Sequence, residues 1–196
     1  MTPAEFKSAW LQHNNNLCPV SLNTLDRFPL TASAKDFLHI SGLPEDAAPF
    51  LSFFSDTTPE EKYSSISRLT DWFDFLPADF SHYVVIGADG GGNIIALNTD
   101  AECIVEWLDH EDNFEAEYMN ASILQLAASL LAYQQFVKAV QKENGDDMGA
   151  YINGKFSDTS LEILEDMLYN IDERAVSEGF WYTELRSLLA LRNGNI

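Results

Sequence analysis

The sequence is poor in basic residues. It contains 11 Lys and Arg side chains against 31 Asp and Glu, which gives a formal net charge of −20. Between residues 69 and 137 there is no Lys or Arg at all. So negative a field repels nucleic acid and anionic membrane surfaces, and it attracts basic proteins. Acidity that serves only solubility is the alternative interpretation.

Cysteine and long apolar runs are also scarce. Cys18 and Cys103 lie far apart in the sequence, and neither belongs to a metal-ligand spacing. We expect two free, buried thiols in a reducing compartment rather than a disulfide. The N-terminus shows no basic segment followed by an apolar core, and no apolar run approaches the ~20 residues of a membrane helix. Together these observations predict a cytoplasmic protein.

What the sequence does contain is material for one folded core. Of its 196 residues, 46% are hydrophobic and 12% aromatic, which argues against a disordered chain. No internal repeat or low-complexity tract divides it. The length and composition therefore predict a single domain over residues 1–196.

The most informative stretch covers residues 83–109. Residues 83–86 and 93–97 are rich in β-branched and aromatic side chains, which is typical of strands. Residues 102–108 predict a third strand, with Cys103, Val105 and Trp107 on one face. Glycines and polar residues lie between these runs, so we expect an antiparallel meander joined by tight turns. Trp107 is expected in the core, between this sheet and a helix that begins near Ser122.

The flanking sequence predicts mostly helices. Capping residues and apolar periodicity place helices at residues 2–16, 33–41, 121–144, 158–175 and 180–193. Residues 50–54 are expected to form a strand at a sheet edge, and residues 114–119 another, half-buried strand. A capping-box pattern at Thr58 predicts a short helix of a turn or two. Residues 66–80 receive no assignment, although their aromatic side chains Trp72, Phe73 and Phe75 are expected to be buried.

These elements define the expected fold class. It is α+β, a single domain whose central antiparallel, mainly meander sheet spans about residues 50–120 and is flanked by N- and C-terminal helices.

Motifs for enzymatic chemistry are weak. The Gly-rich residues 87–92 lack the Lys-Ser or Lys-Thr of a P-loop and precede a strand, which favours a hairpin turn. The acidic residues beside His110 follow one another on a turn and match no EF-hand spacing. No HExxH or GxSxG motif is present. We therefore expect no catalytic, cofactor-binding or metal-binding residues.

The meander carries a family resemblance. This region has a first strand that ends in Ile86-Gly87, a Gly-rich turn, a second strand that ends in LNT and a third strand that leads to Asp109-His110. The arrangement resembles the SUKH superfamily, with its Smi/Knr-type fold. The segments FLHISGLP at residues 37–44 and NASI at residues 120–123 resemble its SUKH-4 branch. The resemblance covers about residues 30–140. Bacterial members are mostly immunity proteins, which bind and neutralise a toxin delivered by neighbouring cells, and the family shares no catalytic residue.

The functional hypothesis joins this resemblance to the charge pattern. We expect a non-enzymatic immunity protein that binds a basic toxin domain through acidic side chains of the sheet region. A small-molecule or peptide-binding regulatory module of the same fold, and a hydrolase that uses some of the carboxylates, are the alternatives. The oligomeric state is left open. The expected partner-binding residues are Asp89, Asp100, Glu102, Glu106, Asp109, Glu111, Asp112, Glu115 and Glu117.

Overall fold

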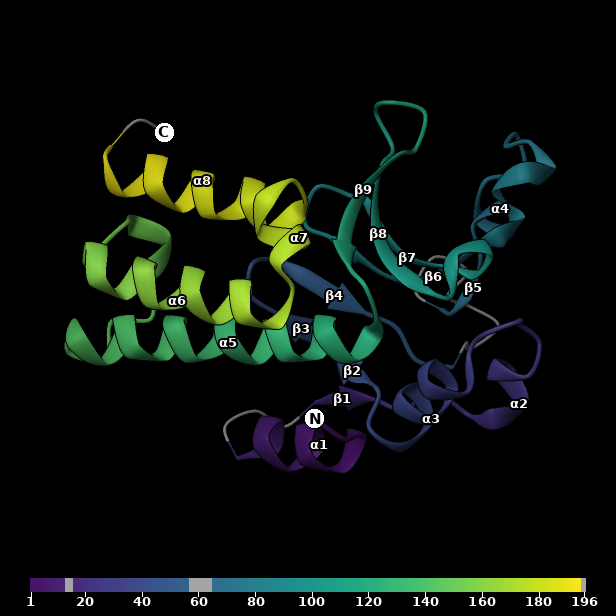
Figure 1. The fold of residues 1–196 in the computed structure, drawn as a ribbon, viewed down its shortest axis with the longest axis horizontal. Coiled ribbons are helices and arrows are strands. Elements are labelled where there is room, and N and C mark those ends of the chain that lie inside the picture. The colour runs from purple at the N-terminus through teal and green to yellow at the C-terminus, as the bar shows by residue number, and fades with distance from the viewer. Residues whose placement is uncertain (13–15, 57–64, 195–196) are drawn as a thin grey trace.

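The computed structural model describes residues 1–12, 16–56 and 65–194 (Figure 1). The helices in this part of the chain are α1 (Pro3–Leu11), α2 (Leu22–Leu25), α3 (Ala32–Ile40), α4 (Leu69–Trp72), α5 (Ile123–Glu143), α6 (Asp158–Ile171), α7 (Glu173–Ser177) and α8 (Phe180–Arg192). The strands are β1 (Leu17–Cys18), β2 (Leu43–Pro44), β3 (Asp46–Ala47), β4 (Leu51–Phe53), β5 (Ser67–Arg68), β6 (Tyr83–Asp89), β7 (Ile94–Asn98), β8 (Ile104–Asp109) and β9 (Glu115–Asn120). Short 3-10 helices are η1 (Ala78–His82), η2 (Thr99–Ala101) and η3 (Tyr151–Asn153).

The central sheet contains the expected meander. Strands β6, β7, β8 and β9 are paired antiparallel in that order, with Val84 opposite Leu97 and Leu97 opposite Val105. On the other side of β6, β4 and β5 pair with successive parts of the strand, and β3 adds to β4. The α+β fold class is thus confirmed. The strand expected at residues 50–54 is β4, but it is not an edge strand, because β3 covers it.

The sheet is buried on both faces, which explains why its strands read as continuous apolar runs. Val84 and Ile86 of β6 point into the main core with the helices. Tyr83 and Val85 of the same strand belong to a second cluster on the opposite face, which α4 covers with Trp72. Successive side chains of a strand alternate between faces, so both sets must be apolar here.

The long helix α5 runs beside α6 on one side and α1 on the other, and it also packs against β8 and β9 (Figure 1). Ser122 caps it by accepting a hydrogen bond from the amide of Gln125. By length and composition alone α5 could cross a membrane, which corrects the expectation that no apolar run approaches that length. Half of its apolar window is buried inside the protein, as in the central helix of a folded domain.

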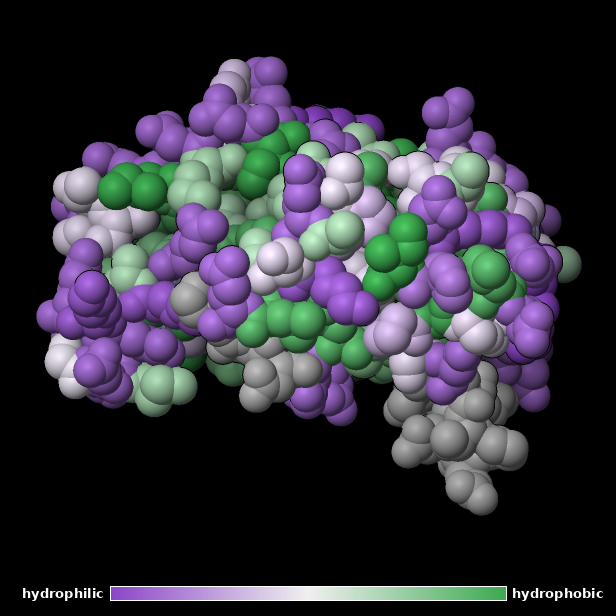
Figure 2. Space-filling model, turned by 90° about the horizontal axis from the view of Figure 1, so that it is seen from below, coloured by the Kyte–Doolittle hydropathy of each residue, from purple (hydrophilic) through white to green (hydrophobic). Residues whose placement is uncertain are grey.

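The N-terminal helices cover one side of α5. Phe6 and Trp10 of α1 are buried in the main core, with the Phe6 ring 5.3 Å from that of Phe37 on α3. Figure 2 shows this side of the molecule from below, with groups of hydrophobic side chains separated by hydrophilic ones. The main core therefore runs from the N-terminal helices through the sheet to the C-terminal helices, as one domain.

Several expected boundaries are wrong. The helix expected at residues 2–16 has its Thr2 capping box but ends at Leu11. The helix expected at 158–175 is two helices, because Asp172 adopts an extended conformation between α6 and α7. Glu102 and Cys103 lie in a turn with positive φ, and the third strand starts only at residue 104. The short helix expected after residue 58 falls outside the described residues.

Residues 66–80, left unassigned from sequence, form β5, α4 and the start of η1. Trp72 is buried as expected, and Phe73 packs partly buried against the second cluster. Phe75 contradicts the expectation, since its side chain is 73% exposed.

A buried polar network joins the C-terminal helices to the sheet. Asp172, which is 7% exposed, accepts hydrogen bonds on Oδ2 from the Tyr118 hydroxyl (3.0 Å), the Ala121 amide (2.9 Å) and Asn120 Nδ2 (3.3 Å). The Asn120 side-chain oxygen accepts a further bond from the indole of Trp181 on α8 (3.0 Å). Asp172 therefore ends α6 by leaving the helical conformation and fixes the start of α7 against β9.

Candidate functional site

The end of the β8–β9 hairpin and helix α7 form an open groove of about 500 Å³. It collects four of the nine predicted partner-binding carboxylates. The groove is lined by Trp107, Asp109, Asp112, Glu115, Ala116, Glu117, Tyr118, Arg174 and Glu178. We call it the acidic groove.

Two aromatic side chains lie among these acids. Tyr118 is nearly buried and is held by its hydroxyl bond to Asp172. Trp107 is only half-buried, and its ring lies 6.4 Å from that of Phe180 on α8. The prediction that Trp107 is packed in the core beneath α5 is therefore wrong, although its ring does contact the edge of the main core. The groove has an apolar lining that a partner side chain can contact.

The predicted carboxylates that the groove collects are Asp109, Asp112, Glu115 and Glu117. Asp112 and Glu115 are exposed, whereas Asp109 is half-buried and accepts a bond from the Glu111 amide (2.9 Å). Burial raises the pKa of Glu117, against the effect of a hydrogen bond from the Thr183 hydroxyl, which lowers it. Four acids on the two strand ends and the loop of the β8–β9 hairpin concentrate negative charge at one opening.

One cation belongs to the lining. The guanidinium of Arg174 lies 4.1 Å from the centre of the Tyr118 ring, and its Nε donates to Glu178 (2.8 Å). A guanidinium above an aromatic ring is a favourable cation–π contact. In the described part of the chain, no Lys or Arg forms an ion pair with any of the nine predicted residues. The acidic groove is therefore only partly neutralised within the protein.

Asp89 lies beside the groove, but its carboxylate is already hydrogen-bonded within the protein. Its Oδ1 accepts hydrogen bonds from the main-chain amides of Gly91 (2.8 Å) and Asn93 (2.9 Å). Its Oδ2 accepts hydrogen bonds from Asn93 Nδ2 and from the Trp107 indole N–H (2.9 Å). Burial works to raise the pKa of Asp89, but these hydrogen bonds outweigh it and hold the pKa below its usual range. The carboxylate thus closes the β6–β7 hairpin and fixes Trp107.

Replacing this carboxylate should weaken the fold most at neutral pH. Asp89→Asn puts an amide donor opposite other donors, so we expect a loss of about 1–2 kcal/mol in unfolding free energy at pH 7. Because the folded pKa is lowered, the ionised carboxylate stabilises the fold fully above its unfolded pKa of about 3.9, and that stabilisation is lost progressively as the pH falls from this value through the lower folded pKa. Urea unfolding at pH 7 and pH 3 should therefore show the difference between wild type and Asp89→Asn shrinking at the lower pH. An unchanged difference would contradict this role.

The other predicted residues lie elsewhere. Glu111 is exposed at the tip of the β8–β9 hairpin, and Glu102 is exposed in the turn before β8. Glu106 belongs to the opposite face of the sheet, where it accepts a bond from Asn98 (2.8 Å). Burial and the Glu106 carboxylate raise the pKa of Tyr83 to about 12.

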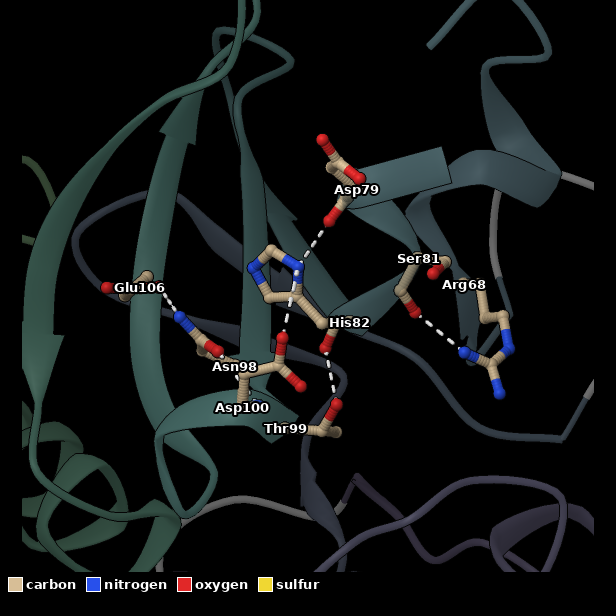
Figure 3. Close-up of polar contacts among 8 residues, drawn as sticks. All are labelled: Arg68, Asp79, Ser81, His82, Asn98, Thr99, Asp100 and Glu106. Atoms are coloured by element: carbon tan, nitrogen blue, oxygen red, sulfur yellow. Dashed lines mark hydrogen bonds and ion pairs between the residues drawn. The ribbon is translucent and has the colours of Figure 1, made fainter. Parts of the chain in front are cut away.

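Asp100 lies at a second cleft of about 520 Å³, at the other end of the sheet. Figure 3 shows its neighbour His82 between Asp79 and Asp100, with the imidazole bonded to the Asp79 carbonyl and 3.9 Å from the Asp100 carboxylate. The Thr99 hydroxyl donates to the main-chain carbonyl of His82 (2.8 Å) and not to its ring. Arg68 donates to the Ser81 carbonyl (2.7 Å). The Arg68, His82 and Thr99 side chains thus each bond a main-chain carbonyl of this turn, and the hydroxyl of Thr99 does not bond the imidazole.

Groups of three or more His, Cys, Asp or Glu side chains able to hold a metal ion do not occur among the described residues. Cys18 is half-buried and Cys103 is buried, and both are free. The Cys103 sulfur accepts a hydrogen bond from the main-chain amide of Thr31 (3.4 Å), and this contact supports the N-terminus of α3.

Sequence reasoning missed the α7 side of the groove. Arg174 and Glu178 follow Tyr118 by more than 50 residues in the sequence, so no local pattern joins them to it. The one signal was Asp172 within a helical pattern, since an Asp in a helix interior competes for backbone hydrogen bonds and favours helix ends.

Comparisons with known proteins identify the family of the chain. No curated protein and no solved structure matches the chain. The model of the family described as SUKH-4 immunity protein matches residues 5–187. That match extends well beyond the 30–140 region of the sequence resemblance and includes both sides of the acidic groove. The chain belongs to the SUKH-4 immunity protein family.

Proposed function

We propose that this immunity protein acts in the cytoplasm by binding a basic toxin domain directly, without catalysis, through the acidic groove. The observation that supports the proposal is the groove itself. Five carboxylates and two aromatic rings line it, and Arg174 is the single basic residue that the described part of the chain contributes. An apolar surface surrounded by charge of one sign is suited to a protein partner of the opposite charge.

In the proposed mechanism, electrostatic attraction first guides the toxin domain to this protein, and the bound protein then covers the toxin's basic surface. The negative field of the chain accelerates encounter with a basic surface, and the groove then accepts Lys or Arg side chains of the partner. Toxins that act on nucleic acid need basic surfaces to hold the phosphate backbone. A protein bound over such a surface blocks the substrate without any need to alter it.

The salt dependence of association tests this proposal. The full chain is mixed with the toxin domain encoded beside its gene, and the association rate is measured by stopped-flow fluorescence between about 20 mM and about 500 mM salt. We expect the rate constant to fall at least about tenfold over this range, because screening removes the steering. Toxin activity should fall in proportion to the complex formed. An association rate that does not change with salt would contradict the electrostatic mechanism.

A further inference from the structure

Phe50 occupies a backbone position that favours glycine. Ala47 of β3 pairs with Leu51 of β4, so a loop of three residues joins these strands and Phe50 is its last residue. Its φ is 58°, in the left-handed region. Hairpin loops of this length usually place Gly or Asn at that position, because a side chain there strains the backbone.

Packing does not explain this choice. The Phe50 side chain is 66% exposed. Phe114 provides the comparison, since its φ is 60° but its side chain is only 5% exposed, with its ring 4.8 Å from that of Phe73. Burial of the ring offsets the strain at Phe114, whereas at Phe50 the strain is combined with an exposed aromatic ring. Strain that the fold does not need points to a functional use.

The surroundings of Phe50 continue the acidic groove. A second groove of about 410 Å³ lies at this turn, lined by Pro49, Phe50, Asp89, Gly90, Gly91, Phe180 and Glu184. Phe180 contacts Trp107, which lines the acidic groove, and the Trp107 indole is bonded to Asp89. Phe180 of the second groove thus contacts Trp107 of the acidic groove, and Phe50 stands at the far end of this aromatic surface. Of the two carboxylates beside Phe50, Asp89 is held by the β6–β7 hairpin, and Glu184 accepts a hydrogen bond from the Tyr133 hydroxyl (2.6 Å).

We propose that Phe50 is an aromatic anchor of the toxin-binding surface, and that it enters an apolar pocket on the basic toxin domain. This inference rests on the proposed function. Interfaces combine a few aromatic residues, which supply most of the binding energy, with a charged rim. Here the charged rim is the acidic groove beyond Trp107, so the partner that fits this aromatic surface carries basic residues beside its apolar pocket.

The decisive variant is Phe50→Gly, because stability and binding should change in opposite directions. Glycine relieves the strain at positive φ, so the melting temperature should rise by about 2–4 °C. Loss of the anchor should raise the Kd for the toxin domain encoded beside the gene by about 30-fold or more. Phe50→Tyr keeps the ring and should bind within about threefold of wild type. Calorimetric titration at fixed salt measures each Kd.

Phe75→Ala is the matched control. Phe75 is also a highly exposed phenylalanine, but its ring contacts Phe73 on the face of the sheet that α4 covers. It should leave the Kd unchanged. If Phe50→Gly binds like wild type while charge reversal in the acidic groove abolishes binding, the anchor is excluded and the proposed function stands. If Phe50→Gly melts several degrees lower, the residue supports the fold, and that result also overturns the inference.

Discussion

Asp172→Ala is expected to lower the unfolding free energy by about 3–5 kcal/mol. The substitution removes the acceptor of three donors at once, which are the Tyr118 hydroxyl, the Asn120 amide and the Ala121 main-chain amide. Each buried donor left without a partner costs about 1–3 kcal/mol. For a chain of this length such a loss corresponds to a fall in melting temperature of about 10 °C. Urea unfolding followed by Trp fluorescence measures it, with Trp181 bonded into the same network.

Graded variants separate the network from the helix that carries it. Asp172→Asn keeps one oxygen acceptor and the side-chain shape, so it should be less destabilising than Asp172→Ala. Tyr118→Phe removes a single donor and should cost about 1 kcal/mol. Asp166→Ala, at an exposed position of α6, should be close to neutral. A loss below about 1 kcal/mol in Asp172→Ala would mean that the donors find other partners and that the network does not hold α7 in place.

The consequence for function follows from geometry. Asp172 immediately precedes α7, and Arg174 of this helix together with its C-cap residue Glu178 forms one side of the acidic groove. Asp172 also bonds Tyr118 on the other side. Loosening the network should therefore weaken toxin binding as well as stability. The same residue ends a helix, fixes a strand and shapes the groove, so its loss affects all three.

The sheet was the part of the fold that local sequence predicts well. Residues 83–86 and 94–97 are apolar without alternation because each strand contributes to a core on both of its faces. Turn residues bound these runs closely, so existence, order and pairing of the strands follow from the pattern. The boundaries were less predictable. Cys103 belongs by composition to the third strand, but the chain needs a turn with positive φ there and the strand begins one residue later.

The site could be predicted only in part. The absence of basic residues between 69 and 137 identified the acidic hairpin, which is local in sequence. The α7 side of the groove depends on tertiary packing that brings Arg174 over Tyr118. Trp107 was misplaced because its large apolar ring suggests a core position, whereas its indole N–H is bonded to Asp89 at the edge of the sheet. Charge is visible in a sequence, but whether a carboxylate is free or satisfied by the fold is not.

Reversing charge in the acidic groove should slow toxin association at least about tenfold at low salt. The variant is Asp112→Lys/Glu115→Lys, at two exposed groove residues. Asp109 is left unchanged because its carboxylate supports the hairpin turn. Two Lys side chains replace attraction by repulsion at the groove where a basic partner is proposed to dock, so encounter should become less productive. Stopped-flow association with the toxin domain encoded beside the gene measures the rate, and the deficit should diminish at high salt.

Two further variants distinguish a local effect from net charge. Glu162→Lys/Asp166→Lys makes the same change in net charge on the exposed side of α6, and it should slow association far less. Arg174→Gln removes the groove's own cation and should change the rate in the opposite direction, towards faster association. If the groove and α6 variants slow association equally, the negative field acts only through the total charge of the chain and the groove is not the docking surface. A wild-type rate in Asp112→Lys/Glu115→Lys, with the fold intact, would place the interface elsewhere on the protein.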